Sequence, residues 1–150
     1  MEIVAIQEIS EKMREQGVTI PQGAAIHLAV FSEPYLAHMY AGRKTMESRI
    51  SKNCVAPYGR ISEGDVVVVK RAAGPIEAIF SVGKVCFFDM YKDSMDRIKE
   101  KYSEELCTDE DFWQQKGECR YATVIEIRNL ARVKPFRIEK KDRRAWIALE

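Results

Sequence analysis

Three charged side chains stand close together in the chain, at Lys44, Glu47 and Arg49. A lysine and an arginine can bind phosphate or carbonyl oxygens through charge-assisted hydrogen bonds, and a carboxylate between them can accept a proton or hold both cations in place. If the segment is a strand, Thr45, Glu47 and Arg49 share one face, while Lys44 and Ser48 share the other. The pattern predicts a binding or reaction site, although an ion pair on the surface of an ordinary strand would have the same spacing.

A short helix is predicted directly before these residues. Pro34 suits the first turn of a helix, and Leu36, Met39 and Tyr40 follow at helical spacing. Gly42 then fits the left-handed backbone position that commonly ends a helix. The three charged residues are therefore expected where a helix gives way to a strand.

The spacing Gly-x-Lys-x-x-Glu-x-Arg, formed here by Gly42, Lys44, Glu47 and Arg49, resembles the signature of the ASCH (activating signal cointegrator homology) domain. This family is related to the PUA and EVE domains of RNA-associated proteins. The resemblance covers roughly residues 25–149. Besides the Pro34 helix, it includes the segments that match the family's strands, at residues 26–31, 64–70, 78–85, 135–138 and 145–149.

The resemblance implies an α+β protein with a PUA-like β-barrel, which we place at residues 25–150. Residues 1–24 are expected to form a helical extension, because apolar residues recur at helical spacing until Gly17. This apolar stripe should pack on the domain. It consists of Ile3, Ile6, Ile9 and Met13, with Val4 beside them.

A helical insertion is expected at about residues 91–117, which a minimal ASCH domain lacks. Its first helix is indicated by Met95, Ile98 and Tyr102 at helical spacing. Thr108 is the expected N-cap of a second helix, with acidic residues in the first turn that complement the helix dipole. Phe112 and Trp113 should anchor this second helix.

Composition limits the class of protein. The chain has 150 residues with 46% hydrophobic content, enough for one domain with a full core. It contains no apolar run of about 18 residues, and its first residues do not resemble a secretory signal, so we expect a cytoplasmic protein without a membrane partner. The oligomeric state is left open.

Neither a metal nor any other cofactor is expected. The four cysteines, at positions 54, 86, 107 and 119, are widely separated and are predicted to be free thiols. His27 and His38 are expected to be structural or exposed. The sequence contains no recognisable catalytic triad, nucleotide-binding glycine loop or HExxH motif.

Charge is unevenly distributed although the formal net charge is only +1. Residues 43–71 carry seven basic against three acidic side chains, and residues 128–144 carry eight against two. Residues 89–118 carry ten acidic against five basic side chains. If the two basic segments meet in space they would form a face for phosphates; otherwise, residues 140–144 are a solvated hairpin tip.

Three further residues are candidate contacts for a nucleic acid. Tyr58 and Arg60 lie in a loop at about residues 51–60, where Tyr58 could stack on a base and Arg60 could bind a phosphate. Either could equally be an ordinary exposed loop residue. Tyr121 begins a long apolar strand and could contact a base or be a core tyrosine with one polar partner.

The resemblance implies two main classes of function, and the first is binding of RNA or a modified nucleoside or nucleotide. In this function Lys44, Thr45, Glu47 and Arg49 would contact the ligand together with Tyr58, Arg60 and Tyr121.

The second class is hydrolysis in the same pocket, with Lys44 and Glu47 as the catalytic residues of a ribonuclease or of an amidohydrolase acting on an acylated nucleoside. The amidohydrolases of the family have a threonine where this chain has Glu47, so their nucleophile is not matched. A transcription-related adaptor module is a third alternative.

Overall fold

A computed structural model describes residues 2–149, with side chains from residue 6 onward. The chain forms six strands and four helices within these residues. The strands are β1 (Ile26–Phe31), β2 (Met46–Ser51), β3 (Val66–Arg71), β4 (Ile76–Asp89), β5 (Tyr121–Phe136) and β6 (Trp146–Leu149). The helices are α1 (Glu2–Glu15), α2 (Tyr35–Tyr40), α3 (Met95–Leu106) and α4 (Glu110–Gln115).

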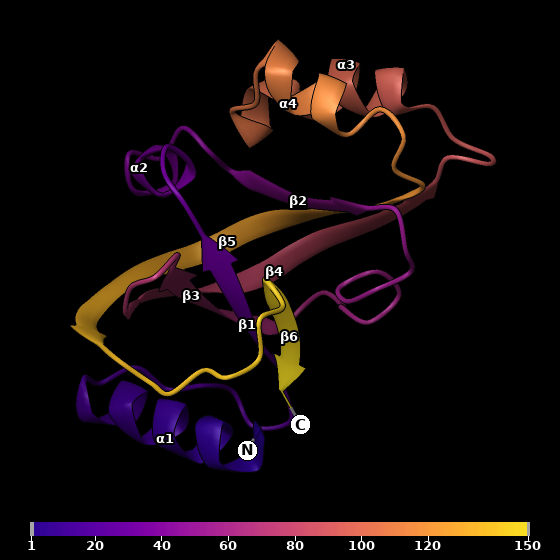
Figure 1. The fold of residues 1–150 in the computed structure, drawn as a ribbon. Coiled ribbons are helices and arrows are strands. Elements are labelled where there is room, and N and C mark those ends of the chain that lie inside the picture. The colour runs from indigo at the N-terminus through magenta and orange to yellow at the C-terminus, as the bar shows by residue number, and fades with distance from the viewer. Residues whose placement is uncertain (1, 150) are drawn as a thin grey trace.

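The strands form one sheet in the order β2-β5-β4-β3-β1-β6. Only β1 and β3 run parallel; the other neighbours are antiparallel. The β4–β5 ladder contains several register shifts, and such bulges bend strands, so the sheet curls into a half-barrel (Figure 1). The predicted α+β architecture, with a β-sheet that curls toward a barrel, is confirmed.

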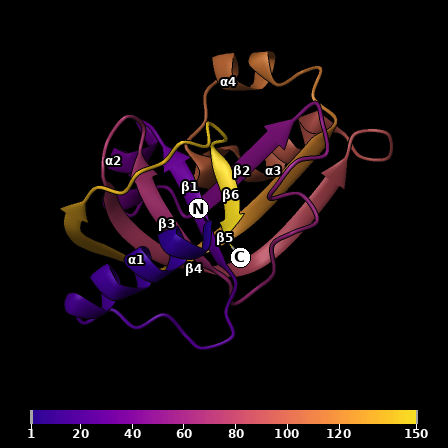
Figure 2. The same cartoon turned by 60° about the horizontal axis from the view of Figure 1, so that its bottom comes forward.

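Helix α1 lies at one end of this half-barrel, and α3 and α4 lie at the other (Figures 1 and 2). Ile9 and Met13 of α1 are fully buried and belong to the same apolar cluster as Leu28, Val68 and Ile147 of the sheet. Helix α1 thus contacts the sheet through these two residues. The side chains of Ile3 and Val4 lie outside the described part of the chain.

The helical insertion has a small core of its own against β2 and β5. This core contains Ile98, Tyr102 and Leu106 of α3 and Trp113 of α4, packed on Ala122 and Val124 of β5. Helix α4 begins one residue later than predicted, because Asp109 rather than Thr108 is its N-cap and accepts a hydrogen bond from the backbone N–H of Phe112. The Thr108 hydroxyl instead accepts from the indole N–H of Trp113.

Two predictions for the C-terminal third were wrong. Pro135 and Phe136 end the long strand β5, so residues 135–138 do not form a separate closing strand. Residues 140–144 are largely exposed, but they are not a hairpin tip, because the strands on either side of them, β5 and β6, are not neighbours in the sheet. The apolar pattern of β5 ends about halfway along the strand, and the strand then continues partly exposed to Phe136. The sequence pattern therefore did not show how far β5 extends.

His27 is buried and lies between the Asp65 carboxylate, at 2.9 Å, and the indole N–H of Trp146, at 3.0 Å. All four cysteines are free thiols. Within residues 2–149, no helix combines the length and apolar character that crossing a bilayer requires.

Candidate ligand-binding pocket

The signature residues lie at the junction between α2 and β2. Gly42 follows α2 with a φ of 77°, the left-handed conformation predicted for it. Lys44 stands before β2, so strand alternation does not govern its direction. Contrary to the sequence-based expectation, its side chain points to Glu47, with the Nζ–Oε1 distance at 3.1 Å.

Glu47 is the centre of a group of three charges, in which Lys44 is also buried and Arg49 is partly buried. Its Oε1 accepts from Lys44 Nζ and, at 3.0 Å, from the backbone N–H of Ser48. Its Oε2 accepts from Arg49 Nε at 3.1 Å and Nη2 at 2.9 Å. Burial alone raises the pKa of Glu47, but the charges of Lys44 and Arg49 outweigh it and lower this pKa below its ordinary value. Glu47 is therefore an ionised hydrogen-bond acceptor and a weak base.

Arg49 joins strands that the sheet itself does not pair. Its Nη2 donates to the backbone carbonyl of Val30 at 2.9 Å, and its Nη1 donates to that of Ala145 at 3.3 Å. Its guanidinium carbon also lies 4.9 Å from the centre of the Phe31 ring and 5.0 Å from the Trp146 ring. Because β2 is at one edge of the sheet and β6 at the other, these contacts partly close the half-barrel.

Lys44 connects the pocket to the helical insertion through a hydrogen bond to α3. Its Nζ donates to the carbonyl of Leu106, at the end of α3, at 2.9 Å, and lies 5.1 Å from the Tyr35 ring centre. The neighbouring backbone N–H of Thr45 donates to the carbonyl of Glu105. A cation near helix C-terminal carbonyls is favourable, so Lys44 holds α3 in place as well as facing the pocket.

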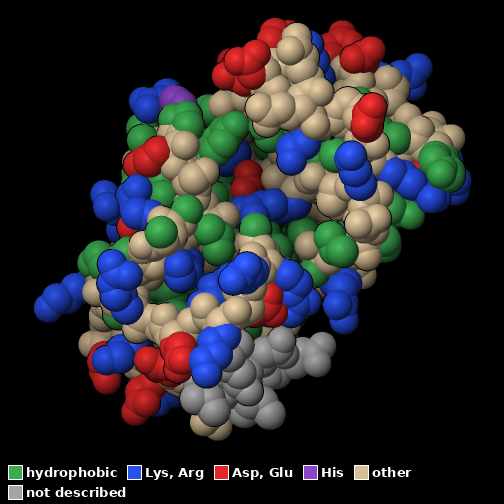
Figure 3. Space-filling view, viewed as in Figure 1, with side chains coloured by type: hydrophobic (Ala, Val, Ile, Leu, Met, Phe, Trp, Pro, Cys, Tyr) green, Lys and Arg blue, Asp and Glu red, His purple; other side chains and the backbone are tan. Residues whose placement is uncertain are grey.

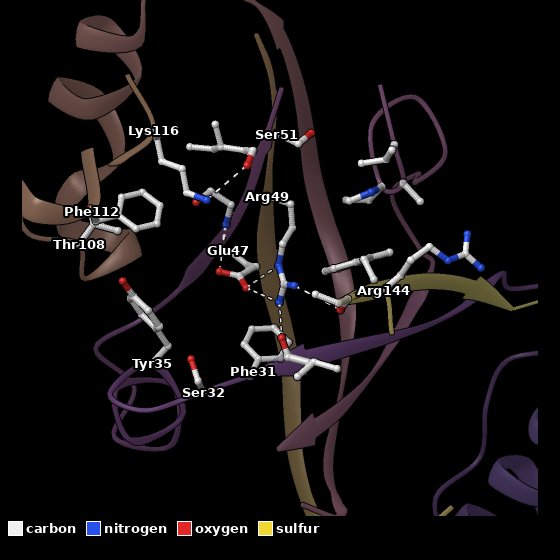
Figure 4. A pocket seen from close by; sticks show the side chains of 18 of the residues that line it. Phe31, Ser32, Tyr35, Glu47, Arg49, Ser51, Thr108, Phe112, Lys116 and Arg144 are labelled. Carbon is white, nitrogen blue, oxygen red and sulfur yellow. Dashed lines mark hydrogen bonds and ion pairs between the residues drawn. The ribbon is translucent and has the colours of Figure 1, made fainter. Parts of the chain in front are cut away.

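These residues form the floor of a cavity of about 670 Å³ (Figure 4). Two aromatic residues of the pocket, Tyr35 and Phe112, lie on one side of Glu47 and Arg49, and Arg144 lies on the other. Figure 3 shows basic side chains around the hollow below the insertion. The cations that line the cavity are Lys44, Arg49, Arg60, Lys116 and Arg144.

The cavity brings together four of the residues predicted as contacts: Lys44, Glu47, Arg49 and Arg60. Thr45 is exposed and is not among the lining residues. Tyr58 and Tyr121 also lie outside the cavity lining, where their ring centres are 4.8 Å apart. The two tyrosines thus pack together beside the cavity.

Several lining residues escaped the sequence analysis. Phe31 and Trp146 have the pattern of core residues in strands, and the structure does bury both. Tyr35 opens α2, while Phe112 and Lys116 come from the insertion, whose packing no local pattern shows. The one available signal for Arg144 was its place at the end of the basic segment 128–144.

Among the described residues, no group of three or more histidine, cysteine, aspartate or glutamate side chains is arranged to hold a metal ion. The floor is instead an internally paired set of charges. Such a floor can offer fixed donors and acceptors to a polar ring, and aromatic walls can stack on it.

No protein-family model matches the sequence, and no curated protein matches it. Solved structures do match in fold. The ASCH protein of Zymomonas mobilis aligns with a TM-score of 0.65 at 11% identity, over 83% of this chain and 87% of that one. A serine-to-alanine variant of that protein aligns with a TM-score of 0.63 at 13% identity, over 83% and 88% of the two chains.

A protein of Enterococcus faecalis aligns more distantly, with a TM-score of 0.50 at 13% identity over 86% of each chain. The shared architecture agrees with the signature at Gly42, Lys44, Glu47 and Arg49. The chain therefore shares the fold of the ASCH protein of Zymomonas mobilis.

Proposed function

We propose that the pocket binds a base of RNA, or a modified nucleoside or nucleotide. The observation that carries this proposal is the combination of a paired polar floor, aromatic walls and cationic lining in one cavity of about 670 Å³. The resemblance of the signature to a family related to domains of RNA-associated proteins supports this proposal.

Each part of the cavity has a separate role in this proposal. The Lys44 ammonium has a third N–H beyond those bound to Glu47 and Leu106, and it can donate to a base edge while Glu47 holds it in place. Tyr35 and Phe112 offer ring faces, to which bases bind by stacking. The side chain of Arg60 is exposed and has no hydrogen-bond or ion-pair partner within the described residues, so it is suited to bind the phosphate.

Hydrolysis is supported less well by the same geometry. All four hydrogen bonds that Glu47 accepts hold it as a carboxylate, and its lowered pKa makes it a poor proton acceptor near neutral pH. Lys44 is engaged with both Glu47 and Leu106. Binding uses these groups as they stand, whereas proton transfer would require them to exchange partners.

The proposal is tested by incubating wild type with mixed RNA oligomers and nucleosides and identifying bound and converted species by mass spectrometry. Arg60→Ala should weaken binding of phosphorylated ligands, and Phe112→Ala should weaken binding of all of them. Lys134→Ala, which removes an exposed cation outside the pocket, is the matched control. Absence of any bound species from wild type at moderate salt would refute the proposal.

The same incubation separates binding from hydrolysis. If wild type converts one of the RNA oligomers or nucleosides and folded Lys44→Ala does not, the pocket is the active site of an enzyme. Binding without conversion, weakened by the same substitution, would support a recognition module. Circular dichroism of Lys44→Ala is needed alongside, because Lys44 also anchors α3.

A further inference from the structure

A row of aromatic rings lies beside the pocket, outside its lining. The ring centre of Tyr58 is 5.3 Å from that of Phe87 and 4.8 Å from that of Tyr121. The Arg120 guanidinium carbon lies 4.8 Å from the Tyr121 ring centre and 3.5 Å from that of Tyr91. We call these five residues, Phe87, Tyr58, Tyr121, Arg120 and Tyr91, the stacking row.

Strand register shows that the row continues the pocket surface. Ser51, which lines the pocket, is paired with Tyr121 in the β2–β5 ladder. Arg49 is paired with Thr123, which in turn is opposite Phe87 of β4. Residues paired across a ladder point to the same face and lie about 5 Å apart. The row therefore begins one strand away from the pocket, on the same face of the sheet.

The loop between β2 and β3 joins the two surfaces. Cys54, Val55 and Arg60 of this loop line the pocket, whereas Tyr58 between them packs on Phe87 and Tyr121. A chain leaving the pocket over this loop would reach the stacking row directly.

The row exposes apolar surface. Tyr91 is 78% exposed and Phe87 is 40% exposed. Val55, at 51%, is the third large hydrophobic residue that is exposed among the described side chains, and it lies in the joining loop. Clustering of such residues at one place, rather than their scatter over the surface, marks an interaction site.

Arg120 gives the row a planar guanidinium group with a fixed orientation, whose charge is paired with Asp89. Its Nε and Nη2 donate to the two carboxylate oxygens of Asp89 at 3.0 and 3.1 Å, which holds the guanidinium plane against the tyrosine rings. Tyr91 lies in the turn after β4, and this turn projects beyond the sheet (Figure 1). The surface at the same end of the molecule combines apolar and basic side chains (Figure 3). A planar cation among aromatic rings suits stacked bases.

We propose that the stacking row binds the nucleotides that flank the one in the pocket, so that the ligand is single-stranded RNA rather than a free nucleoside. This inference rests on the function proposed for the pocket. Continuity with that pocket favours RNA over a protein partner, as does the run of ring faces, since every base has a face that can stack. A protein partner is kept as one outcome of the test.

The test compares two probes: a seven-nucleotide RNA with all four bases mixed at every position, and a mixture of the four ribonucleoside 5′-monophosphates. Affinities are measured by calorimetry for wild type, Tyr91→Ala and Tyr91→Phe. Tyr91→Ala should weaken oligomer binding at least about fivefold, the lower range for loss of one stacked base, and leave monophosphate binding unchanged. Tyr91→Phe keeps the ring and should bind like wild type.

Two further variants show whether the loss of affinity is specific to the stacking row. Phe87→Ala removes the other exposed ring and should also weaken only the oligomer. Arg97→Ala removes a cation from α3, outside the row, and should change neither affinity. Tyr91 and Phe87 are exposed enough that their substitution leaves the core intact.

The outcomes are distinguishable. If Tyr91→Ala and Phe87→Ala both bind the oligomer as tightly as wild type, the stacking row does not bind RNA. The proposal for the pocket still holds in that case if Arg60→Ala weakens binding. Failure of wild type to bind either probe would overturn both proposals. If Tyr91→Ala abolished capture of a protein without affecting RNA, the row would be a protein-binding surface and this inference would be wrong.

Discussion

At the scale of single residues, the signature is an internally paired group with a net charge of +1 rather than three independent charges. Glu47 accepts hydrogen bonds from both Lys44 and Arg49, and each cation also donates to a backbone carbonyl, at Leu106 or at Val30. Removing one member of a buried ion pair leaves an uncompensated charge, which costs far more than loss of an exposed pair. The signature therefore stabilises the site that it forms.

Glu47→Gln should lower the free energy of unfolding by about 3 kcal/mol at pH 7. Glu63→Gln is the matched control, because Glu63 pairs with Arg128 on the surface and its substitution should cost less than about 1 kcal/mol. Urea denaturation of both variants measures the difference. Equal effects of the two substitutions would contradict the central role of Glu47.

The cost of Glu47→Gln should also depend on pH. The pKa of Glu47 is lower in the folded protein than its ordinary value of about 4.3 in the unfolded chain. Its charge therefore stabilises the fold fully above that value, and this contribution is lost as pH falls through the folded pKa. The stability difference between wild type and Glu47→Gln should shrink below about pH 4.3. A difference that stayed constant in acid would show that charge is not responsible.

At the scale of elements, the helical insertion forms part of the pocket wall. Phe112 and Lys116 reach the cavity because α4 packs on the sheet through Trp113. This helix has only six residues, and the Asp109 carboxylate at its start accepts a hydrogen bond from the N–H of Phe112. The cap of α4 and the position of the wall are therefore coupled.

Asp109→Ala should lower the free energy of unfolding by about 1 kcal/mol, the usual cost of losing such a cap. It should also weaken ligand binding, because Phe112 would lose its fixed position. Asp111→Ala removes a carboxylate from the same turn but keeps the cap, and should have a smaller effect on both. Thermal denaturation measures the change in stability, and calorimetric titration measures the change in binding. A larger effect of Asp111→Ala than of Asp109→Ala would contradict the assignment of Asp109 as the cap.

At the scale of the whole molecule, α1 covers one end of the half-barrel and α3 and α4 lie at the other (Figure 1). The pocket is lined in part by Phe112 and Lys116, so it lies beside the insertion. Fully buried Ile9 and Met13 make α1 part of the same core as the sheet. The two basic segments also meet, since Arg60 from one and Arg144 from the other line the same cavity.

Ile9→Ala should destabilise the protein by about 3 kcal/mol, within the range for truncating a buried isoleucine. Unfolding should remain a single transition, because α1 shares the core of the sheet. Glu11→Ala on the exposed side of α1 is the control and should change stability by less than about 0.5 kcal/mol. A separate early transition for α1, seen by hydrogen exchange, would show that the extension is an independent unit.

Under the proposed function, the cations that line the cavity predict that affinity for RNA falls with salt. For single strands, the slope of log affinity against log salt is about −0.7 per phosphate contacted. Arg60→Ala should therefore make this slope shallower by about 0.7, whereas Lys134→Ala should leave it unchanged. If the slope of Arg60→Ala equals that of wild type, Arg60 does not contact a phosphate.

The sequence by itself determined the features that depend on short stretches of chain. The spacing from Gly42 to Arg49 indicated the site, because helix ends and signature spacing are local properties. The stripe of α1 and the apolar strands followed from periodicity, since burial of one helix face or of a strand in the core leaves a repeat in the sequence. The ASCH fold was implied separately, by the resemblance of the chain to that family.

Only the tertiary structure decided what surrounds the signature. The contact of Arg49 with Ala145 joins residues 96 positions apart, and Phe112 reaches the pocket from an insertion. Neither relation leaves a local pattern, because both depend on how far the sheet curls and where α4 packs on it. For the same reason, the sequence indicated Tyr58 and Tyr121 as contacts, whereas their position beside the pocket depended on the pairing of β2 with β5.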